Sequence, residues 1–200
     1  TTYFLIDSWI AGTYTRSYTN AFNSWKKLKV FSEKNDAPEI YALAQILKIS
    51  AWHKTLECFG PMPYTHAANP TMNIPFDSEK VVYTAMFQDL TDAINVLTEK
   101  AVNGVKVMEE YDAVYAGDTK KWVKYANSLM LRLAIRVRFA DEEMAKKYAT
   151  QAVGHSIGVM TARDDEAQMS VGAGITFRNN IEWLSETYEE SRMGSSMFSY

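Results

Sequence analysis

Apolar residues recur at helical spacing through most of this chain, and they predict long helices joined by polar loops. In residues 38–59 the apolar positions cover most of the helix circumference, which is typical of a helix with neighbours on several sides. Residues 79–98 carry one apolar stripe from end to end, and so does the segment that begins after Gly117-Asp118. The residues expected to face inward are Ile40, Leu43, Ala44, Ile46, Leu47, Ile49, Ala51, Trp52, Tyr83, Met86, Phe87, Leu90, Ala93, Ile94, Leu97, Trp122, Tyr125, Ala126, Leu129 and Leu133.

Capping and breaking residues set the expected ends of these helices. Pro38 suits a helix start, and either Asp77 or Ser78 suits the N-cap of the helix that follows. Asp141 is expected to cap a fourth helix, which ends at Gly154. The inward residues of that fourth helix are Ala145, Tyr148, Ala149 and Ala152.

The remaining segments carry weaker signals. Residues 3–34 have a partial helical stripe, which the many Thr, Tyr, Ser and Asn residues at positions 13–23 weaken. The Gly-Pro-Met-Pro sequence at residues 60–63 ends a helix and opens a long loop. Residues 105–108 are the only short strand candidate, and residues 181–190 predict a short helix.

The predicted helices group into two successive pairs. Neighbouring helices with apolar stripes pack as antiparallel pairs, so we expect helix 38–59 to pack against helix 79–98. The pairs start about eighty residues apart, from Pro38 to Asp118, which is longer than a tetratricopeptide repeat. The sequence therefore predicts an all-α fold of tetratricopeptide-like helix pairs with long irregular loops.

Composition limits the classes of protein to which the chain can belong. Of the 200 residues, 47% are hydrophobic and 22% are charged, which is enough apolar material for a packed core in one domain. The formal net charge of −3 argues against a nucleic-acid partner, which needs a basic surface. The single cysteine, Cys58, excludes an internal disulfide, and no apolar run is long enough to span a bilayer.

The sequence carries no pattern typical of an active site or a metal centre. Glycine-rich phosphate loops, Cys-x-x-Cys, His-Glu-x-x-His and Gly-x-Ser-x-Gly are all absent. His53 and Glu57 lie four residues apart on one helix face, but two ligands are too few for a metal site. We therefore expect no catalytic residue, no metal and no cofactor, and a protein that is not an enzyme.

One polar and aromatic stretch near the start of the chain has the chemistry of a sugar site. Aromatic faces stack on pyranose rings, and amide and guanidinium groups donate hydrogen bonds to hydroxyls. The alternative is an ordinary helix whose aromatic residues belong to the core. The candidate glycan-binding residues are Trp9, Tyr14, Arg16, Tyr18, Asn20 and Asn23.

Three stretches share the sequence patterns of one family. Residues 58–64, CFGPMPY, contain Phe-Gly-x-x-Pro-Tyr, and residues 87–94 contain Asp-Leu-x-x-Ala-Ile. Residues 115–136 combine Gly-Asp, a Trp and the block Ala-Asn-Ser-Leu-x-Leu-Arg-Leu-Ala-x-Arg. In this order and on predicted helices, the three stretches resemble the SusD/RagB family in its SusD-like branch.

Several residues of these stretches are expected to hold the fold. Gly60 permits a sharp turn, and Pro63 stiffens the exit from it. Asn127 can form hydrogen bonds with backbone groups where a loop meets its helix.

Two arginines of the third stretch are also expected to be structural. Arg132 and Arg136 flank the buried stripe of their helix. Because a buried arginine needs partners, we expect Asp89 or Asp92 of the neighbouring helix pair to supply them.

The resemblance implies a lipoprotein on the outer membrane of a Gram-negative cell. Such a protein captures oligosaccharides or polysaccharides and delivers them to a partner SusC-like TonB-dependent transporter. Its lipid-bearing cysteine would lie upstream, and family members are much longer, so we expect residues 1–200 to be a single SusD-like helical domain without its C-terminal region. Two alternatives stay open, a peptide-capturing lid of the same family and a helical-repeat scaffold for protein partners.

Overall fold

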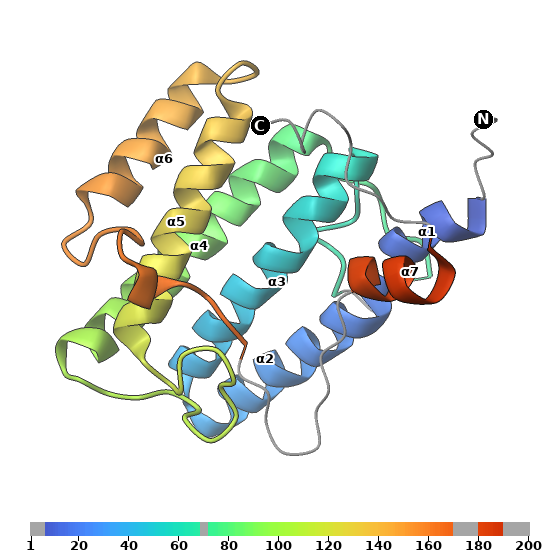
Figure 1. Ribbon diagram of the computed structural model, residues 1–200. Coiled ribbons are helices and arrows are strands. Elements are labelled where there is room, and N and C mark those ends of the chain that lie inside the picture. Colours follow the sequence, from blue (N-terminus) through green and yellow to red (C-terminus); the bar gives the residue numbers. More distant parts are fainter. Residues whose placement is uncertain (1–6, 69–71, 170–179, 190–200) are drawn as a thin grey trace, which may run out of the picture. The chain divides into compact units, whose positions relative to one another are not determined.

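The computed structural model describes residues 7–68, 72–169 and 180–189 (Figure 1). The chain divides into two compact units, residues 1–167 and residues 168–200. The described residues form helices and loops with no strand, which confirms the all-α class predicted from the sequence. The elements are α1 (Asp7–Arg16), the π-helical η1 (Ser17–Phe22), α2 (Asn23–Asn35), α3 (Pro38–Phe59), α4 (Glu79–Val102), α5 (Thr119–Val137), α6 (Glu142–Gly154), the 3-10 turn η2 (Arg163–Asp165) and α7 (Asn180–Tyr188).

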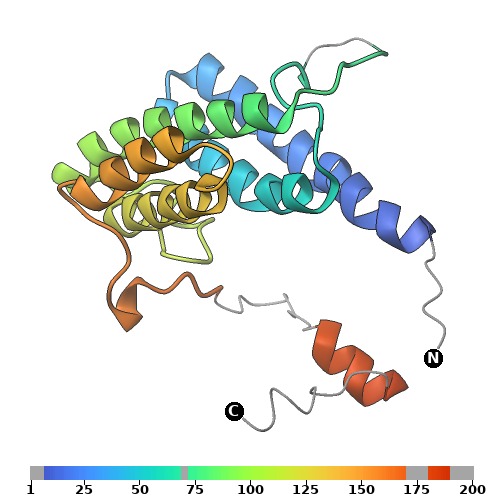
Figure 2. The same cartoon turned by 90° about the horizontal axis from the view of Figure 1, so that it is seen from above.

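Consecutive helices of the first unit pack side by side. α2 contacts α3, α3 contacts α4, α4 contacts α5, and α5 contacts α6. Figure 1 shows each of these helices running opposite to the one before it, and Figure 2 shows the same array from above. The two predicted pairs, α3 with α4 and α5 with α6, are therefore confirmed, and the contact between α4 and α5 joins them into one array.

Capping residues start the helices where the sequence predicts. Pro38 is the first residue of α3. Ser78, rather than Asp77, caps α4 and accepts a hydrogen bond from a backbone N–H three residues on, at 3.4 Å. Asp118 and Asp141 make the equivalent hydrogen bonds for α5 and α6, at 3.1 and 3.0 Å. These side chains satisfy amide groups that a helix N-terminus leaves without partners.

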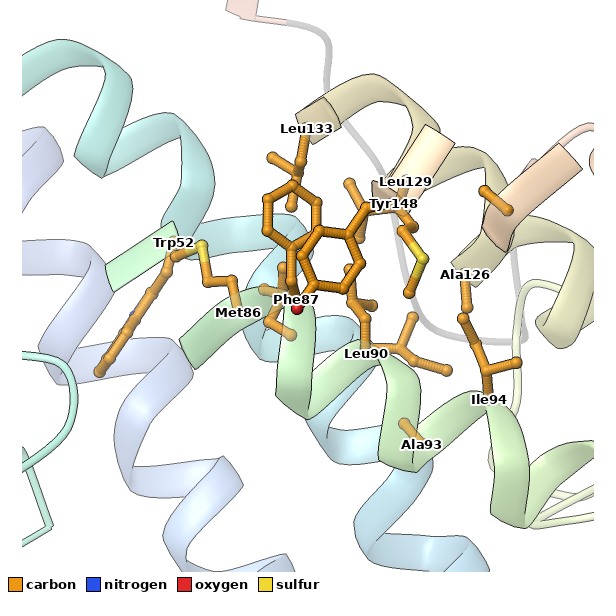
Figure 3. Packing of buried hydrophobic residues seen from close by; sticks show 14 of the residues in the cluster. Trp52, Met86, Phe87, Leu90, Ala93, Ile94, Ala126, Leu129, Leu133 and Tyr148 are labelled. Carbon is orange, nitrogen blue, oxygen red and sulfur yellow. The ribbon is translucent and has the colours of Figure 1, made fainter. Parts of the chain in front are cut away.

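One hydrophobic core runs through α3, α4, α5 and α6, and Figure 3 shows the part of it around α4. The rings of Phe87 and Tyr148 stack there, with centroids 4.1 Å apart and planes within 5°. Burial of one such large side chain contributes about 1.5–3 kcal/mol relative to leaving it in water. We define this contact as the apolar seam, and its members are Phe87, Leu90, Ile94, Leu129, Leu133, Tyr148 and Ala152.

The N-terminal segment is more regular than its sequence suggests. α1, η1 and α2 follow one another without a break from Asp7 to Asn35. Ser17 Oγ and Thr19 Oγ1 each donate a hydrogen bond to a backbone carbonyl one turn earlier, at 3.0 and 3.1 Å. These hydroxyls bind the helix backbone instead of breaking it, which is why a stretch rich in Ser and Thr stays helical. The helix ends at Asp36, which adopts a left-handed φ of 50°.

Two predicted details of the first unit are wrong. Leu47, expected to face inward, is 46% exposed, because α2 and α4 cover other sides of α3. The strand candidate at residues 105–108 forms only an isolated antiparallel bridge between Lys106 and Asp118. A single bridge leaves the segment as part of a loop.

The remaining predicted elements agree with the structure apart from their ends. α4 continues to Val102, beyond its predicted end at residue 98. α7 confirms the short helix that the sequence predicts for residues 181–190. Among the described helices, none combines the length and the apolar character needed to cross a membrane.

Candidate functional site

The first two SusD-like stretches meet at a buried ion pair. Tyr64, in the turn after α3, donates a hydrogen bond to Asp89 Oδ2 of α4 at 2.7 Å. Lys48 Nζ of α3 lies 3.0 Å from the same oxygen. The side chain of Lys48 is only 5% exposed, so its charge depends on this partner. The two sequence patterns thus supply the donor, Tyr64, and the acceptor, Asp89, of one hydrogen bond.

Aromatic rings enclose the ammonium group of Lys48. Its Nζ lies 4.5 Å from the ring centroids of both Trp25 and Tyr64. Trp25 Nε1 donates a hydrogen bond to Gln45 Oε1 at 2.6 Å. Burial lowers the pKa of Lys48, and the neighbouring carboxylate of Asp89 partly opposes this shift. We define these residues as the polar seam, and its members are Trp25, Gln45, Lys48, Tyr64 and Asp89.

The loop after α3 is held close to the array. Gly60 ends α3 with φ 75°, and a Cβ on this residue would lie 3.1 Å from Glu79 Oε1. Tyr18 donates a hydrogen bond to the carbonyl of Pro63 at 2.7 Å. The positive φ of Gly60 and the hydrogen-bonded carbonyl of Pro63 therefore give the predicted structural role of the turn a geometric basis.

The far end of this loop is fixed by one carboxylate. Asp77 accepts hydrogen bonds from the backbone N–H groups of Tyr64 and Thr65, at 3.0 and 2.7 Å. Burial acts to raise the pKa of Asp77, but the hydrogen bonds from Thr65 and Tyr64 outweigh it and lower the pKa. The charged form of Asp77 therefore stabilises the loop.

Two residues of the third stretch donate hydrogen bonds to a second carboxylate, that of Asp112. Asp112 accepts hydrogen bonds from Trp122 Nε1 at 2.7 Å and from Gly117 N at 2.9 Å. Gly117 has φ 78°, and a Cβ there would lie 3.0 Å from backbone atoms of the preceding loop, so this position requires glycine. Asn127 is buried and donates a hydrogen bond to the Gly158 carbonyl at 2.9 Å, which is the predicted role of serving a loop backbone.

The two arginines of this stretch differ from the prediction. Arg132 and Arg136 are exposed, because they lie beside the buried stripe of α5 on a side that faces solvent. Asp89 belongs to the polar seam and Asp92 accepts a hydrogen bond within α4, so neither is their partner. Arg136 Nε instead lies 3.2 Å from Glu57 Oε1 of α3.

A cavity of ≈ 330 Å³ lies beside the polar seam, between α3 and α4, and we call it the α3–α4 cavity. Its wall includes Tyr41, a ring half-buried against α2, and its polar atoms come from Gln45, Asp89 and Asp92. Burial raises the pKa of Tyr41 to about 12, and the charges of Asp89 and Glu33 add to the shift. The Tyr41 hydroxyl is therefore neutral at physiological pH. The apolar lining is Pro38, Ala42, Ala93 and Val96.

A second cavity of ≈ 350 Å³ lies where α3 and α5 end and α4 and α6 begin, and we call it the end cavity. Two ion pairs line it, Arg136 with Glu57 and Lys80 with Asp141, the latter at 3.1 Å. Burial raises the pKa of Tyr83 in its wall. The remaining lining residues are Leu56, Glu79, Val137, Ala140 and Met144.

The aromatic members of the predicted sugar site point toward the core. Tyr14 and Tyr18 are half-buried, with their ring centroids 5.1 Å apart. Tyr14 packs edge-on against Phe59, and Tyr18 lies 4.9 Å from the ring of Trp52. The side chain of Trp9, in α1, lies outside the described residues. The ordinary-helix alternative accounts for the two described tyrosines.

The polar members of the same stretch face the opposite way. Arg16, Asn20 and Asn23 are exposed. Asn23 Nδ2 donates a hydrogen bond to a backbone carbonyl one turn earlier, at 3.2 Å. The structure therefore does not bring these side chains together with the tyrosine rings, and their role in glycan binding stays a prediction.

The sequence analysis missed the residues of the α3–α4 cavity and the polar seam. Gln45 and Lys48 are each 6% exposed although both are polar. The signal was their position within an otherwise apolar helix, because inward polar residues need partners. No group of three or more potential metal ligands gathers in the part of the chain that the structure describes. His53, which the sequence pairs with Glu57, forms a hydrogen bond between its Nδ1 and the Ile49 carbonyl at 3.0 Å.

Comparison with known proteins identifies the family to which this chain belongs. The SusD-like family model, described as Susd and RagB outer membrane lipoprotein, matches residues 1–200. This chain therefore belongs to the SusD/RagB family. Among curated proteins none matches it.

Several solved structures are similar to this chain. A chitin-binding SusD homolog from Flavobacterium johnsoniae is 31% identical with a TM-score of 0.90, over 98% of this chain and 40% of that one. A SusD homolog from Bacteroides uniformis is 34% identical with a TM-score of 0.75, over 85% and 34%. A SusD-like protein from Bacteroides thetaiotaomicron is 32% identical with a TM-score of 0.74, over 82% and 33%. The chain thus spans 40% or less of the length of these relatives.

Proposed function

We propose that this protein is a glycan-binding lipoprotein of the outer membrane that captures oligosaccharides at the cell surface. The family to which it belongs is described as outer membrane lipoprotein, and a relative 31% identical over 98% of this chain is a chitin-binding protein. Captured glycan passes to a partner SusC-like TonB-dependent transporter, and an upstream lipid anchor holds the protein at the membrane. The protein binds its ligand and breaks no bond.

The α3–α4 cavity is the observation that carries this proposal. It combines an aromatic ring, Tyr41, with an amide and two carboxylates, Gln45, Asp89 and Asp92. Sugar rings present an apolar face for stacking and a rim of hydroxyls that donate to such acceptors. The volume of ≈ 330 Å³ falls within the size range of small-molecule sites and suits one sugar residue at a time.

The N-terminal stretch is the second place where glycan contacts are proposed. Arg16, Asn20 and Asn23 are exposed and supply donors along one side of the α1–η1–α2 helix. Their contribution is separable from that of Tyr14 and Tyr18, because the tyrosines pack in the core and their loss also changes stability.

Calorimetric titration of the chain with chito-oligosaccharides, followed by a wider panel of oligosaccharides, tests the function. We expect saturable binding that Tyr41→Ala weakens by about tenfold, the effect of losing one stacking contact. Tyr111→Ala is the matched control, because Tyr111 is 80% exposed and does not line the α3–α4 cavity. Binding that survives Tyr41→Ala but not an Asn20→Ala/Asn23→Ala double variant moves the site to the N-terminal stretch.

Other outcomes decide between capture of glycans and the rival roles. A folded chain that binds no oligosaccharide in the panel argues against glycan capture and favours a peptide-capturing lid or a scaffold for protein partners. Chromatography of the oligosaccharides after incubation checks that they stay intact, and their cleavage would contradict a binding-only role. Delivery to a transporter predicts co-purification of the protein with a TonB-dependent transporter from outer membranes.

A further inference from the structure

The amide of Gln45 is held in one orientation in the wall of the α3–α4 cavity. The residue is only 6% exposed, so its side chain has little freedom to rotate. The indole N–H of Trp25 can only donate, and it donates to Gln45 Oε1 at 2.6 Å. The amide oxygen is therefore fixed against Trp25, and the two ends of the amide cannot exchange without loss of this hydrogen bond.

The other end of the same amide keeps its donors free. Gln45 Nε2 forms no hydrogen bond with any residue that the structure describes, and it is not among the unpartnered atoms that are sealed from solvent. Buried amide groups in folded proteins almost always have hydrogen-bond partners. A nearly buried amide with free donors, in a cavity wall, therefore indicates a place for an acceptor on a ligand.

The wall on α4 supplies acceptors. Asp92 Oδ1 accepts a hydrogen bond from Gln88 at 2.9 Å, and its Oδ2 accepts none from the described residues. Asp89, one turn earlier, already accepts hydrogen bonds from Lys48 and Tyr64 at its Oδ2. Asp92 is therefore the less occupied of the two carboxylates. The cavity offers a neutral donor on α3 and a carboxylate acceptor on α4.

Small apolar side chains complete the wall beside these polar groups. Ala42 of α3 and Ala93 of α4 are both buried and both line the cavity. In a trans secondary amide the N–H and the C=O point in opposite directions, so one such group can accept from α3 while it donates to α4. An acetamide adds a methyl group, which suits the two alanines. A hydroxyl brings no methyl group and offers its donor and its acceptor from a single atom.

We propose that the α3–α4 cavity selects sugars that carry an acetamido group. Gln45 Nε2 donates to the acetamido carbonyl, Asp92 accepts from the acetamido N–H, and the methyl group lies against Ala42 and Ala93. Gln45 then determines specificity, and Trp25 positions it. This inference rests on the proposed function, because it names the class of sugar that the same cavity takes.

Three tetrasaccharides with the same backbone isolate the acetamido group. At one ring carbon, cellotetraose carries a hydroxyl, fully deacetylated chitosan tetramer an ammonium and chitotetraose an acetamide. In calorimetric titrations we expect chitotetraose to bind about tenfold more tightly than the other two, the effect of leaving a donor and an acceptor unpaired. Equal binding of cellotetraose would overturn the acetamido specificity and leave glycan capture standing. Tightest binding of the deacetylated tetramer would overturn it too, because the carboxylates would then act by charge alone.

Variants of the amide and of its partner test the role of Gln45. Gln45→Glu keeps an oxygen for Trp25 but replaces the donor, so the preference for chitotetraose over cellotetraose should fall from about tenfold to near one. Trp25→Phe keeps the ring and frees the amide, so the preference should fall by a smaller factor. A merely structural role would weaken both sugars equally and leave their ratio unchanged, which would overturn the assignment.

Asp92→Ala keeps the test valid if the buried variants fail to fold, because Asp92 is exposed. The preference for chitotetraose should be lost in this variant, whereas a preference that persists would contradict recognition from both walls. Asn95→Ala is the matched control, since Asn95 is an exposed amide of the same helix and does not line the cavity. Its preference should equal that of the parent.

A last probe separates a sugar from a peptide as the source of the amide. N-acetyl-alanine N-methylamide carries secondary amides without a sugar ring. It should bind at least about tenfold more weakly than chitotetraose, because the stacking contact with Tyr41 is missing. Equally tight binding with the same dependence on Gln45 would overturn the proposal in favour of peptide capture. A folded chain that binds no sugar of the wider panel would instead contradict the proposed function itself.

Discussion

The apolar seam and the polar seam both hold α4 to its neighbours, on opposite sides of this helix and with different chemistry. In the apolar seam, Phe87 stacks on Tyr148, and its neighbours are aliphatic side chains that are buried (Figure 3). In the polar seam, Lys48 and Asp89 form an ion pair between α3 and α4, capped by the Tyr64 hydroxyl. One contact is non-directional, and the other depends on three atoms in fixed places.

The difference shows where each kind of contact is useful. Apolar burial tolerates small shifts, and it suits helices that already run side by side along their whole length. The polar seam ties a loop to two helices, because Tyr64 belongs to the turn that begins at Gly60. The loop also buries Met62 and Ala67 in the core, and the directional hydrogen bond of Tyr64 fixes its position against α4.

The apolar seam should give the largest loss of stability. Phe87→Ala removes a ring that is fully buried and stacked, and we expect it to lower the free energy of unfolding by about 4 kcal/mol. Denaturant titration followed by circular dichroism measures the change. Phe139→Ala is the matched control, because Phe139 is 88% exposed and its loss should change stability by less than about 0.5 kcal/mol. Similar losses in both variants would mean that the seam is not the core.

The polar seam should respond next most strongly. Asp89→Asn keeps the shape of the side chain but leaves the ammonium of Lys48 buried without a counter-charge. Because Asp89 is 26% exposed, we expect a loss near the lower end of the range for broken buried pairs, about 3 kcal/mol. The double variant Lys48→Met/Asp89→Asn should recover much of this loss. Additive effects of the two substitutions would contradict a coupled pair.

The same variant sharpens the comparison through its pH dependence. The pKa of Lys48 in the folded protein is lowered, so the unfolded chain binds this proton more tightly. Stability therefore rises as pH increases from the folded pKa of Lys48 toward its ordinary value, and falls in the opposite direction. Without Asp89 the pKa is lowered further, so Asp89→Asn should gain more stability than the parent as pH rises toward the ordinary pKa of a lysine. Parallel pH profiles would show that Asp89 does not set the charge of Lys48.

Periodicity in the sequence predicts the apolar seam well. The stripe of α4, from Met86 to Leu97, is buried as expected, and Asp118 and Asp141 cap the helices that the pattern places after them. Both signals act over three or four residues, so a single sequence contains them. The exposure of Leu47 depends instead on which neighbours surround α3, and no local pattern records that.

Periodicity fails at the polar seam for a related reason. Lys48 and Asp89 are 41 residues apart, and nothing in either local sequence says that the two side chains meet. The predicted sugar stretch shows the same need for spatial information, because residue type suggested one continuous surface while the helix places Tyr18 inward and Asn20 outward. Residue types alone therefore do not predict a binding site. The side of the helix on which each residue lies must also be known.

A smaller effect should follow from the hydrogen bond that joins the N-terminal helix to the loop. Tyr18→Phe removes the hydroxyl that donates to the Pro63 carbonyl at 2.7 Å but keeps the ring. We expect a loss of about 1 kcal/mol in the free energy of unfolding, measured by denaturant titration. Tyr111→Phe, on an exposed tyrosine, is the control and should change nothing. An unchanged Tyr18→Phe variant would mean that water replaces the hydroxyl at no cost.

The smallest effect on stability should come from the exposed amides of the N-terminal helix. Asn20→Ala/Asn23→Ala removes two side chains that face solvent and replaces them with a better helix former. We expect the free energy of unfolding to change by less than about 0.5 kcal/mol, in contrast to the tyrosines of the same stretch. Because the fold is preserved, the double variant isolates the binding role of these residues in an oligosaccharide titration. Loss of binding at unchanged stability would assign them to the glycan site, whereas unchanged binding would leave the α3–α4 cavity as the place where the sugar ring stacks.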